Sequence, residues 1–442
     1  MPVSVFLAVG LSAGCGALSV PDARPVSSPL LPAWNSNHIR QHLSFLHGGS
    51  VRGRVDGTLG YGVATSYVSE RLNEYRLQPP TVGDFRILFT TPRNVVHASR
   101  VRIGDADSVS LRPGMDFLPD GRSANLSAAI SGLGIVASEE PWTGPAVPLL
   151  LQGEQETRRL ETLRDAGISV VLIEKDDLAP RPASRNVTGL GVLDITRDAA
   201  DRILAGAQSV TGRPGVLRLR RPLKVEVAAE FDPTASGINV IGYVPGKHPV
   251  LAREAVVVCT HLDAVGSFGG VDFIDLGNYG VEVAAILDLA RQYASFSRLT
   301  RIPERTLIVA FLGGGTIDSG GFRAFLRQPV WDMDFVSAIV YAGAPARGRK
   351  SLIAAAGPFG DRLRFVSATD SIPDVVLPAG SWKASESPPG EKGLQIDAAD
   401  PESYLAEAVR SAEALAERLY FVAGDELTAR ASSTATLLED ER

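Results

Sequence analysis

The residues best suited to chemistry lie just beyond two apolar, strand-like runs in the second half of the chain. His261 and Asp263 follow the run Ala255–Thr260, and an imidazole beside a carboxylate can bind a metal ion or move a proton. The run Thr306–Phe311 leads instead into three glycines, Gly313–Gly315, which offer no side chain. Three interpretations of this turn are open: a phosphate cradle, a plain tight turn, or a catalytic turn that lacks its carboxylates.

The pattern around the glycines disfavours two common catalytic arrangements. No Gly-x-x-x-x-Gly-Lys-Ser/Thr motif and no nearby lysine accompany the turn, so a phosphate cradle is a weak interpretation. No Gly-x-Ser-x-Gly elbow is present, and Ser319 only resembles a fragment of a serine-protease nucleophile motif. A plain structural turn remains compatible with the sequence.

Carboxylates in the surrounding loops are the candidates for a rebuilt metal site. Hard cations accept carboxylate oxygens alone, so a single calcium-like or magnesium-like ion is an open alternative. Glu282 falls in the first turn of an expected helix, where a carboxylate also favours the helix dipole. Asp318 is expected to cap the next helix. The four candidates are Asp272, Asp275, Glu282 and Asp318.

Strand-like and helix-like segments alternate from residue 223 onward. This alternation predicts an α/β fold with a mostly parallel sheet that is covered on both faces. A helical pattern also spans residues 38–75. Strands are expected at 225–231, 239–244, 255–260, 306–311, 336–341 and 351–355, and helices at 281–296, 322–327, 361–368 and 401–422.

Residues 85–220 have a different pattern of expected secondary structure. Short strands are expected at 132–137 and 167–173, and helices at 155–166 and 197–204. We therefore expect a small β-rich insert lobe that contributes few strands to the main sheet. A chain of 442 residues also predicts two domains plus tails. The expected divisions are a leader and linker at 1–37, an α/β domain at 38–109 and 221–424, an insert at 110–220, and a disordered tail at 425–442.

The net charge and the cysteines limit which partners and which cellular location the sequence predicts. The formal net charge of −6 argues against a nucleic-acid-binding protein, which would present a basic face. Cys15 follows the apolar segment Val3–Gly14, which is similar to a bacterial lipoprotein leader with Cys15 as the lipidated residue. We therefore expect an exported protein, either an envelope lipoprotein that contacts the membrane through a lipid anchor or a periplasmic or extracellular protein.

The order of several motifs resembles one enzyme family. A buried strand followed by His-x-Asp, and then a helix entered through Asn278–Glu282, resembles the co-catalytic zinc aminopeptidases, family 28 of the metallopeptidases. Segments Gly53–Gly60, Asn239–Gly246 and Thr306–Phe311 match further parts of that family, and residues 110–215 resemble its protease-associated insert. The resemblance covers about residues 38 to 422 and implies a zinc-exopeptidase fold.

The resemblance also implies which positions would form the site. In the family, two zinc ions are held by histidines and carboxylates, and a Glu is the general base. His261 matches the first zinc ligand, and Asp263 matches the carboxylate that orients it. The other positions lack the family residue: Asn278 replaces the bridging Asp, Gly314 or Gly315 the Glu base and its neighbouring ligand, Ala342 a later Asp, and Glu386 the second His.

A count of histidines supports the loss of the site. His261 is the last histidine in the chain, and His38, His42, His47, His97 and His248 all precede it, so none can fill the C-terminal ligand position. The resemblance therefore implies a catalytically inactive homologue without a cofactor, which acts by binding a peptide or protein ligand or as an envelope scaffold. The alternative is an active metallo-aminopeptidase that holds zinc through displaced ligands.

Overall fold

The structure is a computed structural model of the chain. It describes residues 35–105, 107–136, 141–152, 155–275, 279–296, 304–317, 319–343, 352–354, 356–366, 376–378 and 401–428. Cys15, the other residues of the expected leader and the tail beyond 428 lie outside these ranges. No helix in the described ranges is long and apolar enough to cross a membrane.

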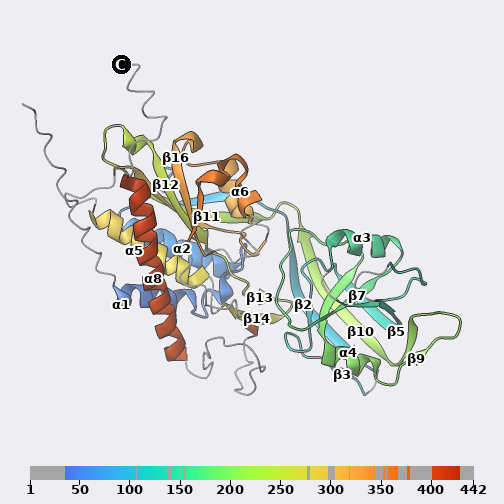
Figure 1. The fold of residues 1–442 in the computed structure, drawn as a ribbon. Coiled ribbons are helices and arrows are strands. Elements are labelled where there is room, and N and C mark those ends of the chain that lie inside the picture. The colour runs from blue at the N-terminus through green and yellow to red at the C-terminus, as the bar shows by residue number, and fades with distance from the viewer. Residues whose placement is uncertain are drawn as a thin grey trace, which may run out of the picture. The chain divides into compact units, whose positions relative to one another are not determined.

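The first sheet has six strands in the order β1-β11-β15-β12-β16-β17. Its strands β11, β12 and β16 are labelled in Figure 1. Strands β15, β12, β16 and β17 are parallel neighbours, whereas β11 pairs antiparallel with β1 and β15. The central strands are continuous apolar runs and are buried along their whole length, as strands covered on both faces must be. The bounds are β1 Arg86–Thr90, β11 Ser236–Val244, β12 Ala255–His261, β15 Thr306–Leu312, β16 Val336–Ala342 and β17 Leu363–Val366.

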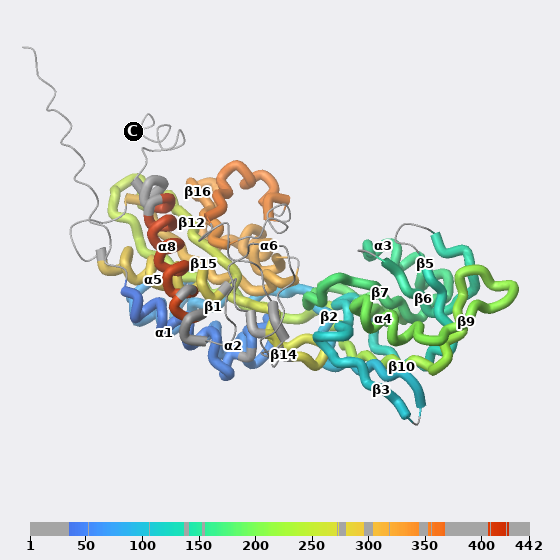
Figure 2. The backbone as a smooth tube through the Cα atoms, turned by 60° about the horizontal axis from the view of Figure 1, so that its bottom comes forward, coloured from blue at the N-terminus to red at the C-terminus, as the bar shows by residue number. Residues whose placement is uncertain are grey.

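Helices cover both faces of this sheet. On one face α5 and α8 lie side by side, and each contacts β12, as Figures 1 and 2 show. On the other face α6 contacts β11 and β1, and its Phe322 and Phe325 belong to a buried cluster that includes Val257 and Ile308. The predicted mixed α/β fold is therefore confirmed. The bounds are α1 Ser36–Leu46, α2 Leu59–Glu74, α5 Tyr279–Phe296, α6 Gly320–Arg327 and α8 Pro401–Thr428, with short 3₁₀ turns at Arg52–Arg54, Leu251–Arg253, Met333–Phe335 and Gly357–Arg362.

The second sheet has nine strands, in the order β3-β2-β10-β5-β6-β7-β8-β4 with β9 paired to β10. Strands β5 to β8 are parallel neighbours, and the remaining pairs are antiparallel. Helix α4 contacts β7, β8 and β10. The bounds are β2 Arg93–Ile103, β3 Val109–Ser110, β4 Phe117–Pro119, β5 Leu126–Val136, β6 Leu149–Gln152, α3 Thr157–Asp165, β7 Val170–Lys175, β8 Gly191–Thr196, α4 Arg197–Leu204, β9 Gln208–Ser209 and β10 Val216–Asp232.

A small third sheet combines two strands that closely follow β12 with one strand from much later in the chain. It consists of β13 Ser267–Phe268, β14 Val271–Asp275 and β18 Val376–Pro378. The backbone of Asp272 pairs with Ser267, and that of Asp275 pairs with Val376. Two of the four candidate carboxylates therefore stand on one short strand of this sheet.

Several expected elements differ from the structure. The strand expected at 225–231 exists, but as part of β10 it belongs to the second sheet rather than the first. Residues 352–354 are helical instead of extended, since a short apolar run fits either state. The helix expected at 361–368 is wrong, because Leu363–Val366 forms the edge strand β17 beside β16. The long helical pattern of 38–75 is two helices, interrupted by a segment that contains Gly48 and Gly49.

Candidate functional site

His261 is a packed side chain at the carboxyl end of β12. Its residue is 2% exposed, and its ring meets that of Tyr341 edge to face at 5.6 Å between centroids. Gly315 is so close that a Cβ built there would lie 2.1 Å from Cγ of His261. The imidazole therefore occupies the space that any side chain at position 315 would need.

Burial determines the charge state of His261. The loss of hydration lowers its pKa below the usual value, against the smaller opposing effects of Asp263 and of a hydrogen bond with the Leu312 backbone. The ring is therefore expected to be neutral at pH 7.

Asp263 holds the glycine turn in place. Its Oδ1 accepts a hydrogen bond from the Gly315 N–H at 2.7 Å, and its Oδ2 accepts from the Thr316 N–H at 2.9 Å and the Thr316 hydroxyl at 2.8 Å. Its Oδ1 lies 3.9 Å from Nδ1 of His261, which is longer than a hydrogen bond. Both carboxylate oxygens are thus engaged by the turn rather than by the imidazole.

The remaining glycines of the turn have conformational and packing reasons to be glycine. Gly314 has φ of +63°, in the left-handed region that glycine adopts without strain. The Gly313 N–H donates to Oδ1 of Asn239 at 3.0 Å, and the Gly313 carbonyl accepts from the Gly321 N–H at 2.9 Å. The backbone N–H groups of Gly313 and Gly315 therefore bond within the protein, which disfavours a phosphate cradle.

Buried polar groups behind the turn were not predicted from the sequence. Asp56 and Arg93 form an ion pair of 3.0 Å, and their side chains are 0% and 7% exposed. Burial and the charge of Asp263 raise the pKa of Asp56 to about 7, although Arg93 acts in the opposite direction. The Tyr61 hydroxyl donates to the Ile238 carbonyl at 2.6 Å. The only sequence signal was the turn-like Asp56-Gly57 pair, which says nothing about burial.

The carboxyl end of β16 has a glutamate beside it. Ala342 is fully buried, and its carbonyl accepts a hydrogen bond from the Thr260 hydroxyl at 3.0 Å. Glu282, in the first turn of α5, packs against Gly343, where an added Cβ would lie 2.9 Å from Oε1 of Glu282. Glu282 is the rebuilt-site candidate whose side chain the structure describes, and its carboxylate lies at the edge of the first sheet.

Several predicted positions cannot be placed. Asn278, Asp318 and Glu386 lie outside the described residues, as do the side chains of Asp272 and Asp275. Within the described part of the chain, no three His, Cys, Asp or Glu side chains form a group that could hold a metal ion.

The described residues at the matched positions do not fit a two-zinc centre. A zinc ion needs three or four ligands. The ring of His261 is enclosed by Gly315 and Tyr341, both oxygens of Asp263 accept hydrogen bonds from the turn, and Ala342 has no ligand atom in its side chain. Among the described residues, this edge offers a neutral, packed imidazole, the structural carboxylate of Asp263 and the Glu282 carboxylate beside Gly343.

Comparison with known proteins identifies the fold. No protein-family model matches the chain, and no curated protein sequence matches it. Among solved structures, the chain is similar to a zinc aminopeptidase from Bacillus subtilis, with a TM-score of 0.53 and 12% identity over 89% of this chain and 95% of that one.

Two further structures give the same result. A peptidase M28 precursor from Shewanella amazonensis SB2B has a TM-score of 0.51 and 14% identity, over 90% of this chain and 97% of that one. An aminopeptidase from Aneurinibacillus sp. strain AM-1 has a TM-score of 0.50 and 14% identity, over 88% and 94%. The resemblance expected from the sequence is confirmed at the level of the fold: this chain has the fold of the family-28 zinc aminopeptidases.

Proposed function

We propose that this chain is a catalytically inactive homologue of a zinc aminopeptidase, which acts by binding a peptide or protein ligand or as an envelope scaffold. The observation that carries the proposal is the contact between His261 and Gly315. In the family the equivalent of position 315 is a carboxylate, whereas here the backbone lies so close to the imidazole that no side chain fits. At this position a glycine that packs against the imidazole stands in place of the family's carboxylate.

The inferred loss of activity follows from ligand number and from the missing base. A positioned general base contributes roughly 10²–10⁴-fold to rate, and glycine at 314 and 315 cannot supply one. Restoring Glu at both positions would not repair the site, because position 342 is Ala and no histidine follows His261. The family's residues are thus missing at several independent places.

One observation favours the alternative of an active enzyme with displaced ligands. The Glu282 carboxylate lies against Gly343, immediately after the position where the family has an Asp. A carboxylate reaching this edge from α5 instead of from β16 would be a displaced ligand. A metal ion held there would still need ligands besides His261 and Glu282. The described residues at the positions that match the family's ligands provide none.

The test is an aminopeptidase assay of the purified chain after dialysis against zinc. The proposal predicts hydrolysis of amino-acid anilides no faster than in a control preparation that carries His261→Ala. Hydrolysis that a chelator abolishes, zinc restores and His261→Ala removes would establish the displaced-ligand enzyme instead.

A lipid anchor at Cys15 is the second part of the proposal. It rests on the apolar segment that precedes this cysteine, and the mature chain would then begin at Cys15 and partition into detergent. Cys15→Ser should release the protein or leave the precursor uncleaved. Recovery of the intact N-terminus, Met1 included, from the cytoplasm would refute the anchor.

A further inference from the structure

Strand β1 forms one edge of the first sheet and pairs with β11 alone. The Ile241 N–H donates to the Phe85 carbonyl at 2.7 Å, and the Thr91 N–H donates to the Ala235 carbonyl at 2.9 Å. In an antiparallel pair, residues that bond to the partner strand alternate with residues whose N–H and C=O groups point away from it. The odd-numbered residues of β1 therefore bond to β11, and the even-numbered residues point their backbone groups outward from the sheet.

This outward row of backbone groups is open at two residues. The N–H groups and carbonyls of Leu88 and Thr90 have no hydrogen-bond partner among the described residues. The Arg86 N–H, in contrast, donates to Oδ1 of Asp84 at 2.9 Å, so the beginning of the edge is already engaged. Unpaired N–H and C=O groups on an edge strand are a template for pairing with a strand of another chain.

The side chains of β1 do not protect its edge. Natural proteins protect edge strands with charged side chains, with proline or by keeping the strands very short. Leu88, in the middle of β1, is apolar and 68% exposed. The charge of Arg86 is paired with Asp84, whose Oδ1 accepts a hydrogen bond from Nε at 3.1 Å. The edge strands of the second sheet are shorter: β3 has two residues, and β4 has three and ends in Pro119.

The sequence of β1 matches itself when two copies pair about a two-fold axis at Leu88. In this register Leu88 lies opposite its own copy, Ile87 lies opposite Phe89, and Arg86 lies opposite Thr90. An aromatic side chain opposite a β-branched one is a favourable cross-strand pair, whereas like charges placed opposite each other are unfavourable. The register contains the favourable pair twice and no pair of like charges.

We propose that β1 pairs antiparallel with β1 of a second copy of this chain, so that two first sheets join into one continuous sheet. The Leu88 N–H of each copy donates to the Leu88 carbonyl of the other, and the Thr90 N–H donates to the Arg86 carbonyl. A strand pair of this length is smaller than a standard protein interface, so the dimer should be reversible. The proposal is independent of the loss of the zinc centre.

Sedimentation equilibrium of the full chain tests the proposal. The chain would carry Cys15→Ser, which removes both the expected lipid and an exposed thiol. Between roughly 1 and 100 µM the average mass should rise from that of one chain toward that of two. A mass of one chain at every concentration would overturn the proposal, and binding of an added extended peptide to β1 would then assign the edge to a peptide ligand.

Two exposed leucines provide the variant and its control. Leu88→Lys places two like charges opposite each other and removes an apolar contact, so the dissociation constant of the dimer should rise roughly tenfold. Leu59→Lys should leave the dimer unchanged, because Leu59 is 87% exposed but belongs to α2. A dimer that Leu88→Lys leaves intact, or that both variants weaken equally, would overturn the proposal.

A backbone variant tests the hydrogen bonds themselves. Thr90→Pro removes an N–H that points outward, and a proline is tolerated on an edge strand at such a position. This variant should weaken the dimer while the chain stays folded, as thermal unfolding at a concentration where the chain is monomeric would show. A folded Thr90→Pro variant that dimerises as tightly as the parent chain would contradict the predicted register.

Disulfide cross-linking locates the two-fold axis. In a hydrogen-bonded antiparallel pair the two Cα atoms lie about 5.5 Å apart, which is within the range of a disulfide. With oxidised glutathione as the electron acceptor, Leu88→Cys should therefore link two chains, whereas Leu59→Cys should not. The native Cys259 is buried and does not interfere. Absence of a link through position 88, or equal linking through both positions, would overturn the proposal.

Discussion

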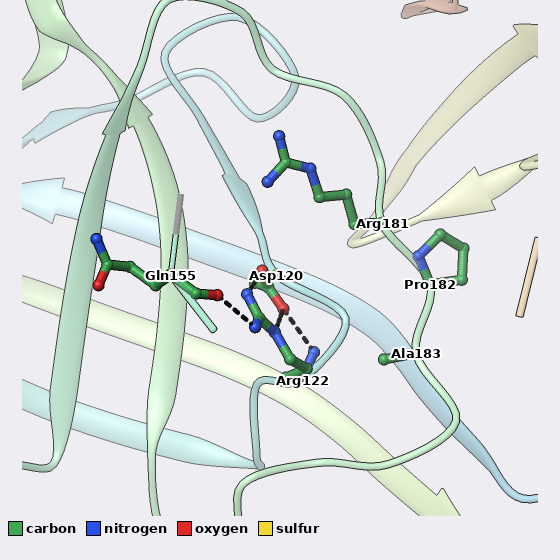
Figure 3. Close-up of a pocket in the computed structure, with 6 residues that line it drawn as sticks. All are labelled: Asp120, Arg122, Gln155, Arg181, Pro182 and Ala183. Carbon is green, nitrogen blue, oxygen red and sulfur yellow. Dashed lines mark hydrogen bonds and ion pairs between the residues drawn. The ribbon is translucent and has the colours of Figure 1, made fainter. Parts of the chain in front are cut away.

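Two regions of this molecule lie beside parallel strands and are built in opposite ways. After β12 and β15, glycine and imidazole fit together by shape, and the carboxylate of Asp263 is satisfied by backbone N–H groups. In the second sheet, Asp120 and Arg122, which follow β4, line an open pocket together with Arg181, which follows β7 (Figure 3). In the first region, glycines without side chains let the turn close over the end of the strands, where α/β folds usually bind ligands. In the second region, paired charges line a pocket that stays open.

The largest expected effect tests the role of charge in the second region. Arg122→Gln should lower the free energy of unfolding by about 3–5 kcal/mol, because it leaves Asp120 buried without its partner. Arg86→Gln is a matched control, since Arg86 also binds the Asp two residues earlier, but both side chains are nearly half exposed. It should cost less than about 1 kcal/mol. Urea denaturation measures both, and equal losses would contradict a pocket held by a buried pair.

A somewhat smaller effect tests the role of shape in the first region. Gly315→Ala should destabilise the fold by about 1–3 kcal/mol, because the added Cβ must displace the buried ring of His261. Gly62→Ala is the control: Gly62 lies within α2 with nothing within 4 Å of an added Cβ, so it should gain up to about 1 kcal/mol.

The cause of that loss can be isolated with a double variant. His261→Ala removes the ring that the new methyl group would meet, so Gly315→Ala should cost little more in its presence. Strictly additive losses would show that the glycine is required for some reason other than the imidazole.

The last effect accumulates gradually with pH and concerns the pH dependence of stability. The pKa of Asp56 is about 7 in the folded chain and about 3.8 when unfolded, so the folded state binds the extra proton between these values. Its contribution to stability is full below about pH 4 and is lost as the pH rises to about 7, by up to about 1.4 kcal/mol per pH unit. Asp56→Asn should flatten this decline in thermal unfolding, and a decline of unchanged slope would contradict the assignment.

The sequence predicted the first sheet well where burial alone decides structure. The strands at Ala255–His261, Thr306–Leu312 and Val336–Ala342 are continuous apolar runs, and each was placed to within one residue. Helix Arg197–Leu204 was also predicted with its observed bounds. Thr196, whose hydroxyl accepts a hydrogen bond from the Ala199 N–H, marks its beginning.

Elements that depend on distant partners were predicted less well. Leu363–Val366 is a strand only because it pairs with β16, and residues 216–232 belong to the second sheet because of their pairing with β2 and β5. Neither pairing leaves a periodic signal that a single sequence reveals.

The candidate site could be predicted only as a pattern of missing residues. The sequence showed the three glycines and the lack of any histidine after His261. It could not show that Gly315 packs on a ring 54 residues earlier in the chain, or that Asp263 holds the turn. Nor could it single out the Asp120–Arg122 pair, because only burial distinguishes this pair from the exposed Asp84–Arg86 pair.

The zinc content of the purified chain after dialysis against zinc tests the central claim most directly. Metal analysis should find well under one zinc per chain, unchanged by His261→Ala or Glu282→Gln, because His261 is enclosed by packing and the matched described positions supply no further ligands. Two zinc ions per chain, reduced by both substitutions, would contradict the claim and establish a metal centre rebuilt from displaced ligands.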